Sequence, residues 1–459
     1  MERIVISGAG LVGSLLAVMM KKKGFEVEVH EKRSDMRLDR ADSGRSINLI
    51  VTSRGMNAVE RLGLLDDVLA ITVPVTGRMM HSLEGELTYQ AYGRDESECN
   101  YSISRAELNK LLMTKAEEAG VKIIFNSELQ DIDIEKNIAS FTGGSTEFTR
   151  LFGTDGAGSP TRKKLAELSG ATDTTEMLES DYKELFMPAK NGEYAIEKNA
   201  LHIWPRGHHM FMALPNLDGS FTMTLYMDQK DFSNLKTPKD VRDFFEKEYK
   251  DSVELMPGFE EEFFQNPQGK LGTVRLSKWV YEDKIALLGD AAHAVVPFFG
   301  QGMNCGFEDC FYLDVFIDRF EGNWSKVFEE YDKQQRPNGH AIADMALENF
   351  VEMRDSVGKE DFLFQKKVEA ALEKRMSEVY RARYGMVTYT LIPYKFAQEA
   401  GLIQKEILSE ICQGKKSIDE IDWDLAEKLV NEKFIPFTKE RNFGVERYLP
   451  NTNYKGFVL

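Results

Sequence analysis

Three glycines near the start of the chain stand at the spacing of a phosphate-binding turn. Gly8, Gly10 and Gly13 follow an apolar run that predicts a strand, and they open an apolar helix that continues to Met20. The first glycine permits a tight bend, the second lets the backbone approach a pyrophosphate, and the third allows close packing of helix on strand. Free amides at the helix N-terminus then bind phosphate oxygens. The segment predicts a nucleotide site made of Gly8, Gly10, Leu11, Val12 and Gly13.

An acidic residue stands at the end of the second predicted strand. Gly24 ends the first helix, residues 25–30 alternate as a strand, and Glu31 follows them. A carboxylate in this position accepts hydrogen bonds from the hydroxyls of a ribose. The strand, glycine turn, helix, second strand and carboxylate therefore predict one Rossmann-type unit.

Later segments place further polar residues after buried strands. A second glycine-rich strand end, residues 151–158, contains Asp155, and the apolar strand 285–288 is followed by Gly289 and Asp290. Residues 297–304 lead into a helix whose N-terminus can point amides at a group that gains negative charge. Taken singly, each segment also fits a plain strand-to-loop or helix-entry turn.

The periodicity of the chain changes along its length. Residues 201–227 alternate with period two around a turn at residues 216–219, which predicts an antiparallel hairpin. Beyond Pro337 the pattern is mostly helical up to about Leu429. We therefore expect an α/β protein, α+β overall, with a Rossmann-like cofactor domain, an antiparallel β-sheet substrate domain and a C-terminal helical region. The expected divisions are 1–75, 98–172 and 272–335 for the cofactor domain, 76–97 and 173–271 for the sheet domain, and 336–459 for the helical region.

Composition and charge exclude several kinds of partner. The chain has 459 residues and a formal net charge of −17, which repels nucleic acids and anionic membranes. Its four cysteines show no paired spacing of a metal or redox site, as is typical of a reducing compartment. No apolar run approaches the ~20 residues that cross a bilayer, and a strand begins too early to leave room for a signal peptide. We expect a cytoplasmic protein without a metal, a nucleic-acid partner or a membrane anchor.

The glycine turn, the segment around Asp155 and the segment around Asp290, in this order, resemble the FAD-dependent aromatic hydroxylases of the para-hydroxybenzoate hydroxylase type. The resemblance implies non-covalent FAD, with NADPH and O2 as co-substrates. It assigns Asp290 to the ribityl chain and Asp155 to a fingerprint shared by FAD and the nicotinamide cofactor. Thr154 stands where an alanine is common. The cofactor-binding residues that it adds are Lys32, Arg33, Arg105, Gly302, Met303 and Asn304.

A closer resemblance, over nearly the whole chain, is to the kynurenine 3-monooxygenase family. The segments that carry it are residues 44–49, 77–81, 92–95, 102–105, 200–205, 213–218, 296–304, 346–353 and 383–388. The resemblance implies that the amino-acid end of L-kynurenine is held by Arg78, Tyr92, Asn349 and Tyr384. It implies that the aromatic ring lies against Met212, Leu214, Tyr226, Pro297, Phe298 and Met353.

The residue types suit these roles, although each also has a structural interpretation. Arginine pairs with a carboxylate in a bidentate way, and tyrosine hydroxyls add directional donors. Asn349 shares a helical face with Met345 and Met353, so its amide needs a partner, which can be structural. Tyr226 stands where some relatives carry phenylalanine, and Phe299 where some carry histidine.

The implied reaction is hydroxylation of L-kynurenine to 3-hydroxykynurenine through a flavin hydroperoxide, a step of tryptophan catabolism toward NAD. The substrate's own amine activates the ring, so no catalytic acid or base is expected and His293 is interpreted as structural. Two alternatives stay open: hydroxylation of another aromatic acid, and a non-catalytic FAD-fold escort protein.

Overall fold

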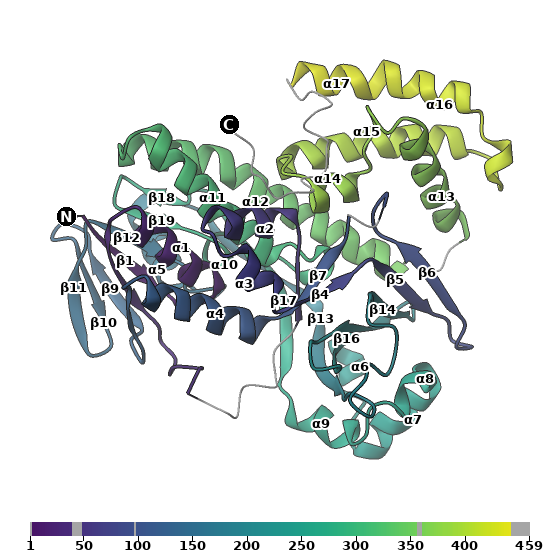
Figure 1. Cartoon of the computed structure of the whole chain (residues 1–459), viewed down its shortest axis with the longest axis horizontal. Helices are drawn as coiled ribbons and strands as arrows, with labels where there is room; N and C mark the ends of the chain where they lie inside the picture. The colour runs from purple at the N-terminus through teal and green to yellow at the C-terminus, as the bar shows by residue number, and fades with distance from the viewer. Residues whose placement is uncertain (1, 39–47, 96–97, 356–359, 442–459) are drawn as a thin grey trace.

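A computed structural model describes residues 2–38, 48–95, 98–355 and 360–441 (Figure 1). Residues 44–47, which belong to one of the segments of the family resemblance, lie outside the described residues. The chain forms two large sheets and two small ones, with a group of helices at its C-terminal end.

A six-stranded sheet in the order β18-β19-β12-β1-β2-β8 carries the predicted nucleotide unit. Its strands are β1 (Arg3–Ser7), β2 (Glu26–His30), β8 (Lys122–Ile124), β12 (Arg150–Gly153), β18 (Val280–Tyr281) and β19 (Ile285–Leu287). All pairs are parallel except β18 with β19. Ile4, Val5 and Ile6 are fully buried, as expected where both faces of a parallel sheet are covered.

Helices pack on this sheet and complete the first core. Helix α1 contacts both α4 and α11. The helices of this part are α1 (Leu11–Lys22), α2 (Ser53–Arg61), α3 (Leu65–Leu69), α4 (Arg105–Glu118), α5 (Pro160–Ser169), α10 (Asp290–His293) and α11 (Gly302–Arg319). One small sheet contains β9 (Leu129–Asp133), β10 (Ile138–Phe141) and β11 (Gly144–Glu147), and the other β3 (Asn48–Val51), β4 (Thr72–Val75) and β7 (Asn100–Ser104).

A seven-stranded sheet in the order β17-β13-β16-β15-β14-β5-β6 contains the predicted hairpin. Its strands are β5 (Gly77–His81), β6 (Leu87–Ala91), β13 (Asp173–Met187), β14 (Ala200–Pro205), β15 (His209–Pro215), β16 (Phe221–Asp228) and β17 (Gln268–Leu276). Alternation along β15 separates two cores, because Phe211 and Ala213 face one side while Met210 and Met212 face the other. The first side packs against α6 (Gln229–Phe232), α7 (Pro238–Glu248), α8 (Lys250–Val253) and α9 (Phe259–Gln265).

The C-terminal helices follow α11, and helix α12 packs on both α11 and α15 (Figure 1). They are α12 (Trp324–Asp355), α13 (Glu360–Arg375), α14 (Arg383–Tyr389), α15 (Tyr394–Cys412), α16 (Trp423–Leu429) and α17 (Ile435–Glu440), with the 3-10 helix η2 (Ile418–Glu420) and the π-helix η3 (Val430–Phe434). A further 3-10 helix, η1 (Pro297–Phe299), precedes α11. The mostly helical character expected from Pro337 to about Leu429 is confirmed, and helix α12 itself begins before Pro337 and continues through it. Within the described residues, no helix combines the length and the apolar character that a bilayer crossing requires.

Two histidines of the seven-stranded sheet are held in the neutral form. Burial lowers the pKa of His202 to about 4, and it does the same for His209. The His202 Nε2 lies 2.7 Å from the carbonyl oxygen of Glu197, to which it donates, so its Nδ1 is the acceptor for His81 Nε2 at 2.8 Å.

Acidification should therefore weaken the fold between about pH 6.5 and pH 4. In this window the unfolded chain binds protons on both histidines and the folded chain does not, so the free energy of unfolding falls as the pH falls. Urea denaturation at several pH values measures this slope. The slope should be shallower in His202→Gln than in His208→Gln, which changes an exposed neighbour; equal slopes would contradict the assignment.

Candidate active site

The turn between β1 and α1 has the geometry of a phosphate cradle. Gly8 has a φ of +102°, and a Cβ there would lie 2.6 Å from the carbonyl oxygen of Thr154. A Cβ at Gly13 would overlap the carbonyl oxygen of Gly8, whereas a Cβ at Gly10 would meet nothing within 4 Å. Helix α1 has no side-chain cap at its N-terminus. The first helical amides are therefore left to face open space beside Gly10, as a bound pyrophosphate requires.

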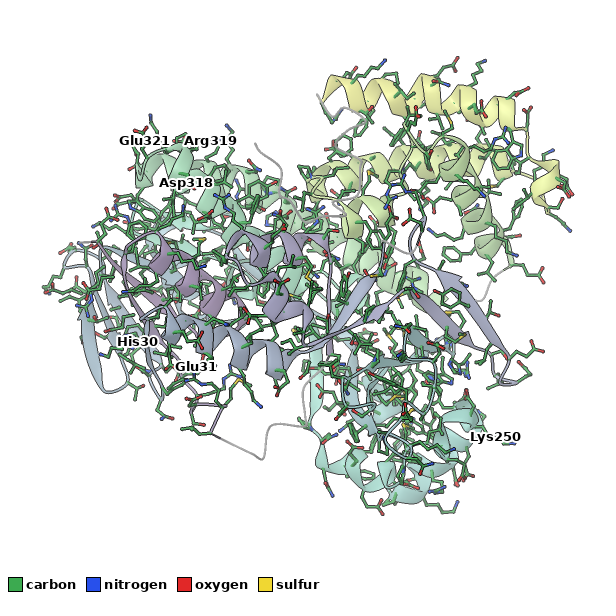
Figure 2. All side chains as sticks on the ribbon, viewed as in Figure 1. His30, Glu31, Lys250, Asp318, Arg319 and Glu321 are labelled. Atoms are coloured by element: carbon green, nitrogen blue, oxygen red, sulfur yellow. The ribbon has the colours of Figure 1, made fainter. Side chains whose placement is uncertain are left out.

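Glu31 lies next to His30 at the carboxyl end of β2 (Figure 2). Its carboxylate is buried and accepts the amide of Ala9 at 2.9 Å through Oε2 and Arg33 Nε at 2.9 Å through Oε1. Glu31 therefore holds the glycine turn in place, and the remaining lone pairs of its oxygens are the acceptors left for a ribose. The Lys32 and Arg33 side chains lie on the exposed side of this strand end.

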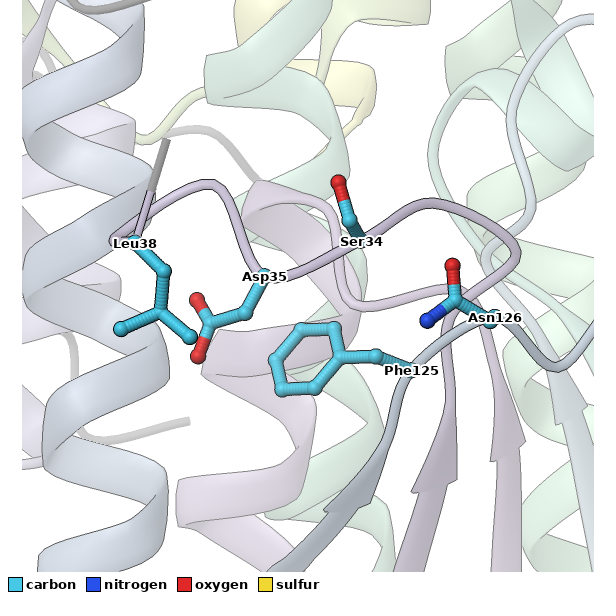
Figure 3. A pocket seen from close by; sticks show the side chains of 5 residues that line it. All are labelled: Ser34, Asp35, Leu38, Phe125 and Asn126. Carbon is cyan, nitrogen blue, oxygen red and sulfur yellow. The ribbon is translucent and has the colours of Figure 1, made fainter. Parts of the chain in front are cut away.

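An open hollow of about 480 Å³ lies just beyond the carboxyl ends of β2 and β8 (Figure 3). Its lining residues are Ser34, Asp35, Leu38, Phe125 and Asn126. None of them is among the residues expected to bind cofactor or substrate. The signal that could have found them is positional, because ligands of open parallel sheets lie outside the carboxyl ends of the strands.

Asp155 ties the second glycine-rich segment together. Its Oδ2 accepts hydrogen bonds from the amide of Thr161 at 3.1 Å and from Thr161 Oγ1 at 2.6 Å, and Oδ1 accepts from Ser159 Oγ. Thr154 Oγ1 donates to the carbonyl oxygen of Gly8 at 2.9 Å, which joins this segment to the glycine turn. These contacts occupy the Asp155 carboxylate. Asp155 therefore acts on the nucleotide site by fixing the backbone of this segment.

Asp290 is exposed, unlike the strand that precedes it. It follows Gly289, whose φ is +59° and whose amide donates to Asp309 Oδ2 at 2.9 Å. This bond fixes the sharp bend after β19, and the Asp290 carboxylate is exposed at the carboxyl end of this strand. The geometry suits a carboxylate that binds hydroxyl groups of a ligand.

His293 has a structural partner. Its Nε2 lies 2.6 Å from Asp309 Oδ2, and both side chains are buried. Burial opposes a positive charge on His293, but the neighbouring Cys305 and Asp309 outweigh it, so its pKa is raised. These three residues are close enough to ligate a metal. The direct pairing of the imidazolium with the carboxylate explains the cluster without one, and it removes His293 from the acid–base groups that face a ligand.

The N-terminus of α11 has no side-chain cap and no acidic residue in its first turn. Gly302 and Met303 are partly exposed there. The Asn304 side chain is fully buried, and it accepts the amide of Thr52 at 2.9 Å and donates to the carbonyl oxygen of Ile50 at 2.8 Å. Only the backbone of Asn304 is therefore left for a cofactor, while its side chain holds the turn between β3 and α2.

Arg78, Tyr92 and Tyr384 form one cluster, here called the arginine–tyrosine clamp. The Arg78 guanidinium carbon lies 5.2 Å from the Tyr92 ring centre and 5.5 Å from that of Tyr384. The two rings stack with centres 5.5 Å apart. Arg78 Nε is buried without a hydrogen-bond acceptor among the described residues. Burial raises the pKa of Tyr92, so its hydroxyl stays a donor at neutral pH.

The η1 turn connects this clamp to an apolar wall. The Phe299 ring stacks on Tyr384 at 5.8 Å, and the Phe298 ring lies 5.1 Å from Tyr226 and 4.4 Å from Phe350. The remaining predicted ring contacts that join the same core are Met212, Leu214 and Met353. Pro297 begins the turn and is exposed. This turn therefore lies next to both the arginine–tyrosine clamp, which suits the charged end of an aromatic ligand, and the apolar wall, which suits its ring.

Asn349 reaches the site but already has a structural partner. Its Nδ2 donates to the carbonyl oxygen of Phe298 at 2.6 Å and lies 3.5 Å from Met353 Sδ. This bond anchors the η1 turn to helix α12. The Asn349 amide nitrogen therefore has a structural role, which the sequence had left open.

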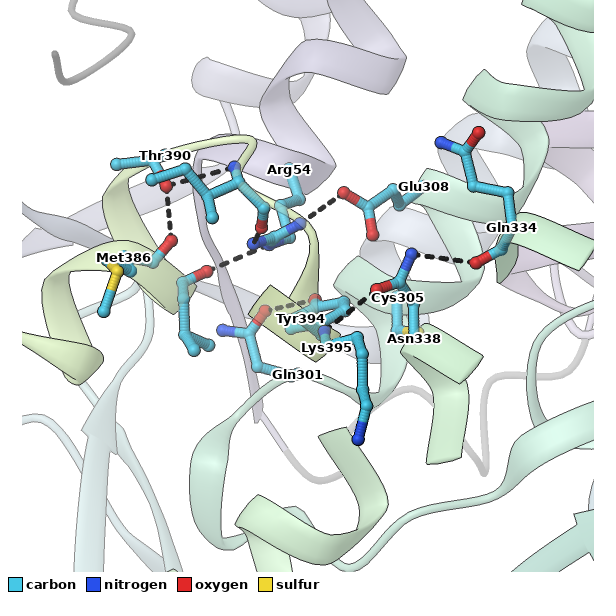
Figure 4. Close-up of polar contacts among 12 residues, drawn as sticks. Arg54, Gln301, Cys305, Glu308, Gln334, Asn338, Met386, Thr390, Tyr394 and Lys395 are labelled. Carbon is cyan, nitrogen blue, oxygen red and sulfur yellow. Dashed lines mark hydrogen bonds and ion pairs between the residues drawn. The ribbon is translucent and has the colours of Figure 1, made fainter. Parts of the chain in front are cut away.

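Other residues of the site gave no signal in the sequence. Asn100 is buried in β7 and donates through Nδ2 to Tyr384 Oη at 3.2 Å. Arg54 is fully buried in α2, pairs with Glu308, and lies 3.8 Å from the Tyr394 ring centre (Figure 4). Tyr394 Oη in turn donates to Gln301 Oε1 at 2.8 Å.

The environment of Arg105 is more open. It begins helix α4 and is exposed. Its charge is close enough to oppose the rise that burial causes in the pKa of Glu184. The structure therefore leaves Arg105 available at the surface but shows no contact that joins it to the glycine turn among the described residues.

Comparison with known proteins identifies the family. The FAD binding domain family matches residues 2–346. The chain is 41% identical over 454 residues to a kynurenine 3-monooxygenase of Myxococcus xanthus, which covers 96% of this chain and 98% of the relative. It is 42% identical over 451 residues to a kynurenine 3-monooxygenase of Cytophaga hutchinsonii, covering 96% and 99% of the two chains.

Solved structures show the same fold at lower identity. A tetrameric form of 2-methyl-3-hydroxypyridine-5-carboxylic acid oxygenase matches with a TM-score of 0.65 and 22% identity over 79% of this chain and 95% of that one. PqsL of Pseudomonas aeruginosa, in complex with 2-aminobenzoylacetate, matches with a TM-score of 0.64 and 18% identity over 77% and 97%. This chain therefore belongs to the FAD-binding-domain family, in the group of the kynurenine 3-monooxygenases.

Proposed function

We propose that this chain is an FAD-dependent monooxygenase that hydroxylates L-kynurenine to 3-hydroxykynurenine with NADPH and O2. The observation that carries the proposal is the arginine–tyrosine clamp beside an apolar wall, at the turn that leads into α11. Kynurenine has the matching shape, with an amino acid at one end and an aminophenyl ketone at the other. The names of the relatives favour this substrate over other aromatic acids.

The residues at the sheet edge fit FAD. The turn at Gly8 and Gly10 would hold the pyrophosphate, Glu31 a ribose, and Asp290 the ribityl chain. The hollow beside Phe125 would take the adenosine end. The uncapped N-terminus of α11 would stabilise negative charge on the flavin. Bound FAD supplies the redox chemistry that takes electrons from NADPH and activates O2.

The side chains of the chain bind and orient the substrate. Arg78 pairs with the substrate carboxylate through its unused donors, and Tyr92 and Tyr384 donate from their hydroxyls. Tyr226 and Phe298 hold the ring and exclude water from it. The amine on the substrate ring makes the carbon beside it electron-rich, so the protein needs no general base there.

The same proposal includes the division of the chain and its location. We assign the six-stranded sheet to cofactor binding, the seven-stranded sheet to the substrate, and the C-terminal helices to closing the substrate site. Helix α12 spans the boundary at residue 336, so one continuous helix joins the cofactor part to the C-terminal helices. A cytoplasmic location agrees with the free thiols of all four cysteines.

Substitutions in the glycine turn should separate folding from cofactor binding. Gly10→Val adds a side chain to open space, so the apoprotein should keep its melting temperature while bound FAD, measured by its visible absorbance, is lost. Gly8→Ala should lower the melting temperature as well, because its Cβ would clash with backbone at a positive φ. Gly144→Ala in β11, also facing open space, is the control and should retain FAD. Full FAD content in Gly10→Val would contradict the cradle.

Removing the charged fork of Arg78 should weaken binding of kynurenine. Arg78→Met should raise its dissociation constant by about 10- to 100-fold, and Arg78→Lys by less, since only the bidentate geometry is lost. FAD content should not change. Titration of the flavin absorbance with L-kynurenine measures this constant, and Arg319→Met, at the exposed end of α11, is the control. An unchanged constant in Arg78→Met would remove the clamp from the substrate site.

A further inference from the structure

The clamp depends on a contact between two distant parts of the chain. Tyr92 follows β6, which belongs to the seven-stranded sheet, and Tyr384 lies in α14 among the C-terminal helices. Their rings stack with centres 5.5 Å apart and share Arg78 between them. Their spacing is therefore set by whatever fixes the loop after β6 relative to the segment before α14.

A buried ion pair joins these two segments. Arg381 Nη2 lies 2.8 Å from Glu98 Oε2, and each side chain is only 1% exposed. Arg94 approaches the same carboxylate, with its amide 2.9 Å from Oε2, and Glu373 Oε1 lies 3.3 Å from Arg381 Nη1. The carbonyl oxygen of Arg381 accepts Gln404 Nε2 at 2.6 Å, which ties the segment to α15.

Charges on this pair persist despite burial. Burial alone would raise the pKa of Glu98, but the adjacent Arg381 guanidinium and the Arg94 amide outweigh it, so that pKa is lowered. A pair that is desolvated on both sides adds little net stability compared with an apolar contact, while it strongly favours one geometry. The ion pair therefore mainly fixes the position of the loop after β6 relative to the segment before α14.

Each partner of the pair also packs against the glycine that follows a clamp tyrosine. A Cβ at Gly93 would overlap the Glu98 side chain, and a Cβ at Gly385 would overlap the Arg381 guanidinium. Tyr92 precedes the first of these glycines and Tyr384 the second. Any shift of the ion pair is therefore transmitted to the backbone of both tyrosines.

We propose that Glu98 and Arg381 are positioning residues that set the spacing of Tyr92 and Tyr384, and so determine recognition of the substrate's amino-acid end. This inference rests on the proposed function of the same site. Asn100 supports it, because this residue, two positions after Glu98, donates to Tyr384 Oη at 3.2 Å. Among the described residues, the side chains and backbone groups that the pair contacts belong to Arg94, Glu373, Tyr389 and Gln404 and not to the apolar wall, so binding of the aromatic part should not depend on it.

Two ligands separate positioning from general stability. L-kynurenine carries the amino-acid end, whereas 2-aminoacetophenone keeps the aminophenyl ketone and lacks that end. In Glu98→Gln and Arg381→Met holoenzymes, the dissociation constant of kynurenine should rise by about 10-fold or more, because small misplacements of binding groups are costly. The constant of 2-aminoacetophenone and the FAD content should stay at wild-type values. Arg381→Lys should restore part of the kynurenine affinity.

A milder variant and a matched control complete the test. Gly385→Ala displaces the Arg381 guanidinium without removing a charge, so it decides the question if the charge-deleting variants do not fold; it should raise the kynurenine constant alone. Arg383→Met breaks an ion pair of the same helix, with Glu348 at 2.7 Å, and should leave both ligands unaffected.

Equal effects on both ligands, or no effect on kynurenine, would overturn the inference. Arg78→Lys, measured alongside, distinguishes the two levels of failure. If it weakens kynurenine binding while the ion-pair variants do not, only the positioning role is wrong. If it too has no effect, the substrate assignment of the clamp is wrong as well.

Discussion

In the proposed function, the turn at residues 297–304 contacts both the cofactor and the substrate, and the rest of the site is arranged around this constraint. Its end is the N-terminus of α11, which no side chain caps, so its amides are free for the flavin that the proposed function places there. Its start carries Phe298 and Phe299, whose rings contact the apolar wall and the clamp. In the proposed function, backbone groups of this short segment bind the cofactor and its side chains bind the substrate.

Such a turn has little intrinsic stability, and buried polar contacts from three directions hold it. Asn304 binds the backbone before α2, Asn349 binds the carbonyl oxygen of Phe298 from α12, and Tyr394 binds Gln301 from α15 (Figure 4). The fully buried Arg54 joins the last of these contacts to α2 and α11. Because each of these contacts joins the turn to a different helix, together they restrain its position.

Much of the fold was predictable because its signals are local. The glycine turn and the hairpin at residues 216–219 follow from neighbouring residues, and both are confirmed. Contacts such as Arg381 with Glu98 join residues far apart in sequence, and nothing local distinguishes their members from surface charges. The partners of side chains were equally hidden: Asn304 stays a predicted flavin contact through its backbone, while its side-chain oxygen accepts the amide of Thr52. The family resemblance identified positions, and the structure supplied the partners.

The central claim is that one turn brings a flavin and the ring of an aromatic amino acid together. Its most direct test is to follow NADPH oxidation by the FAD-loaded protein with L-kynurenine, with anthranilate and without addition, and to identify the product. The account predicts that kynurenine accelerates NADPH oxidation and that 3-hydroxykynurenine forms in step with it. NADPH oxidation that ignores kynurenine, or hydroxylation of anthranilate in its place, would contradict it.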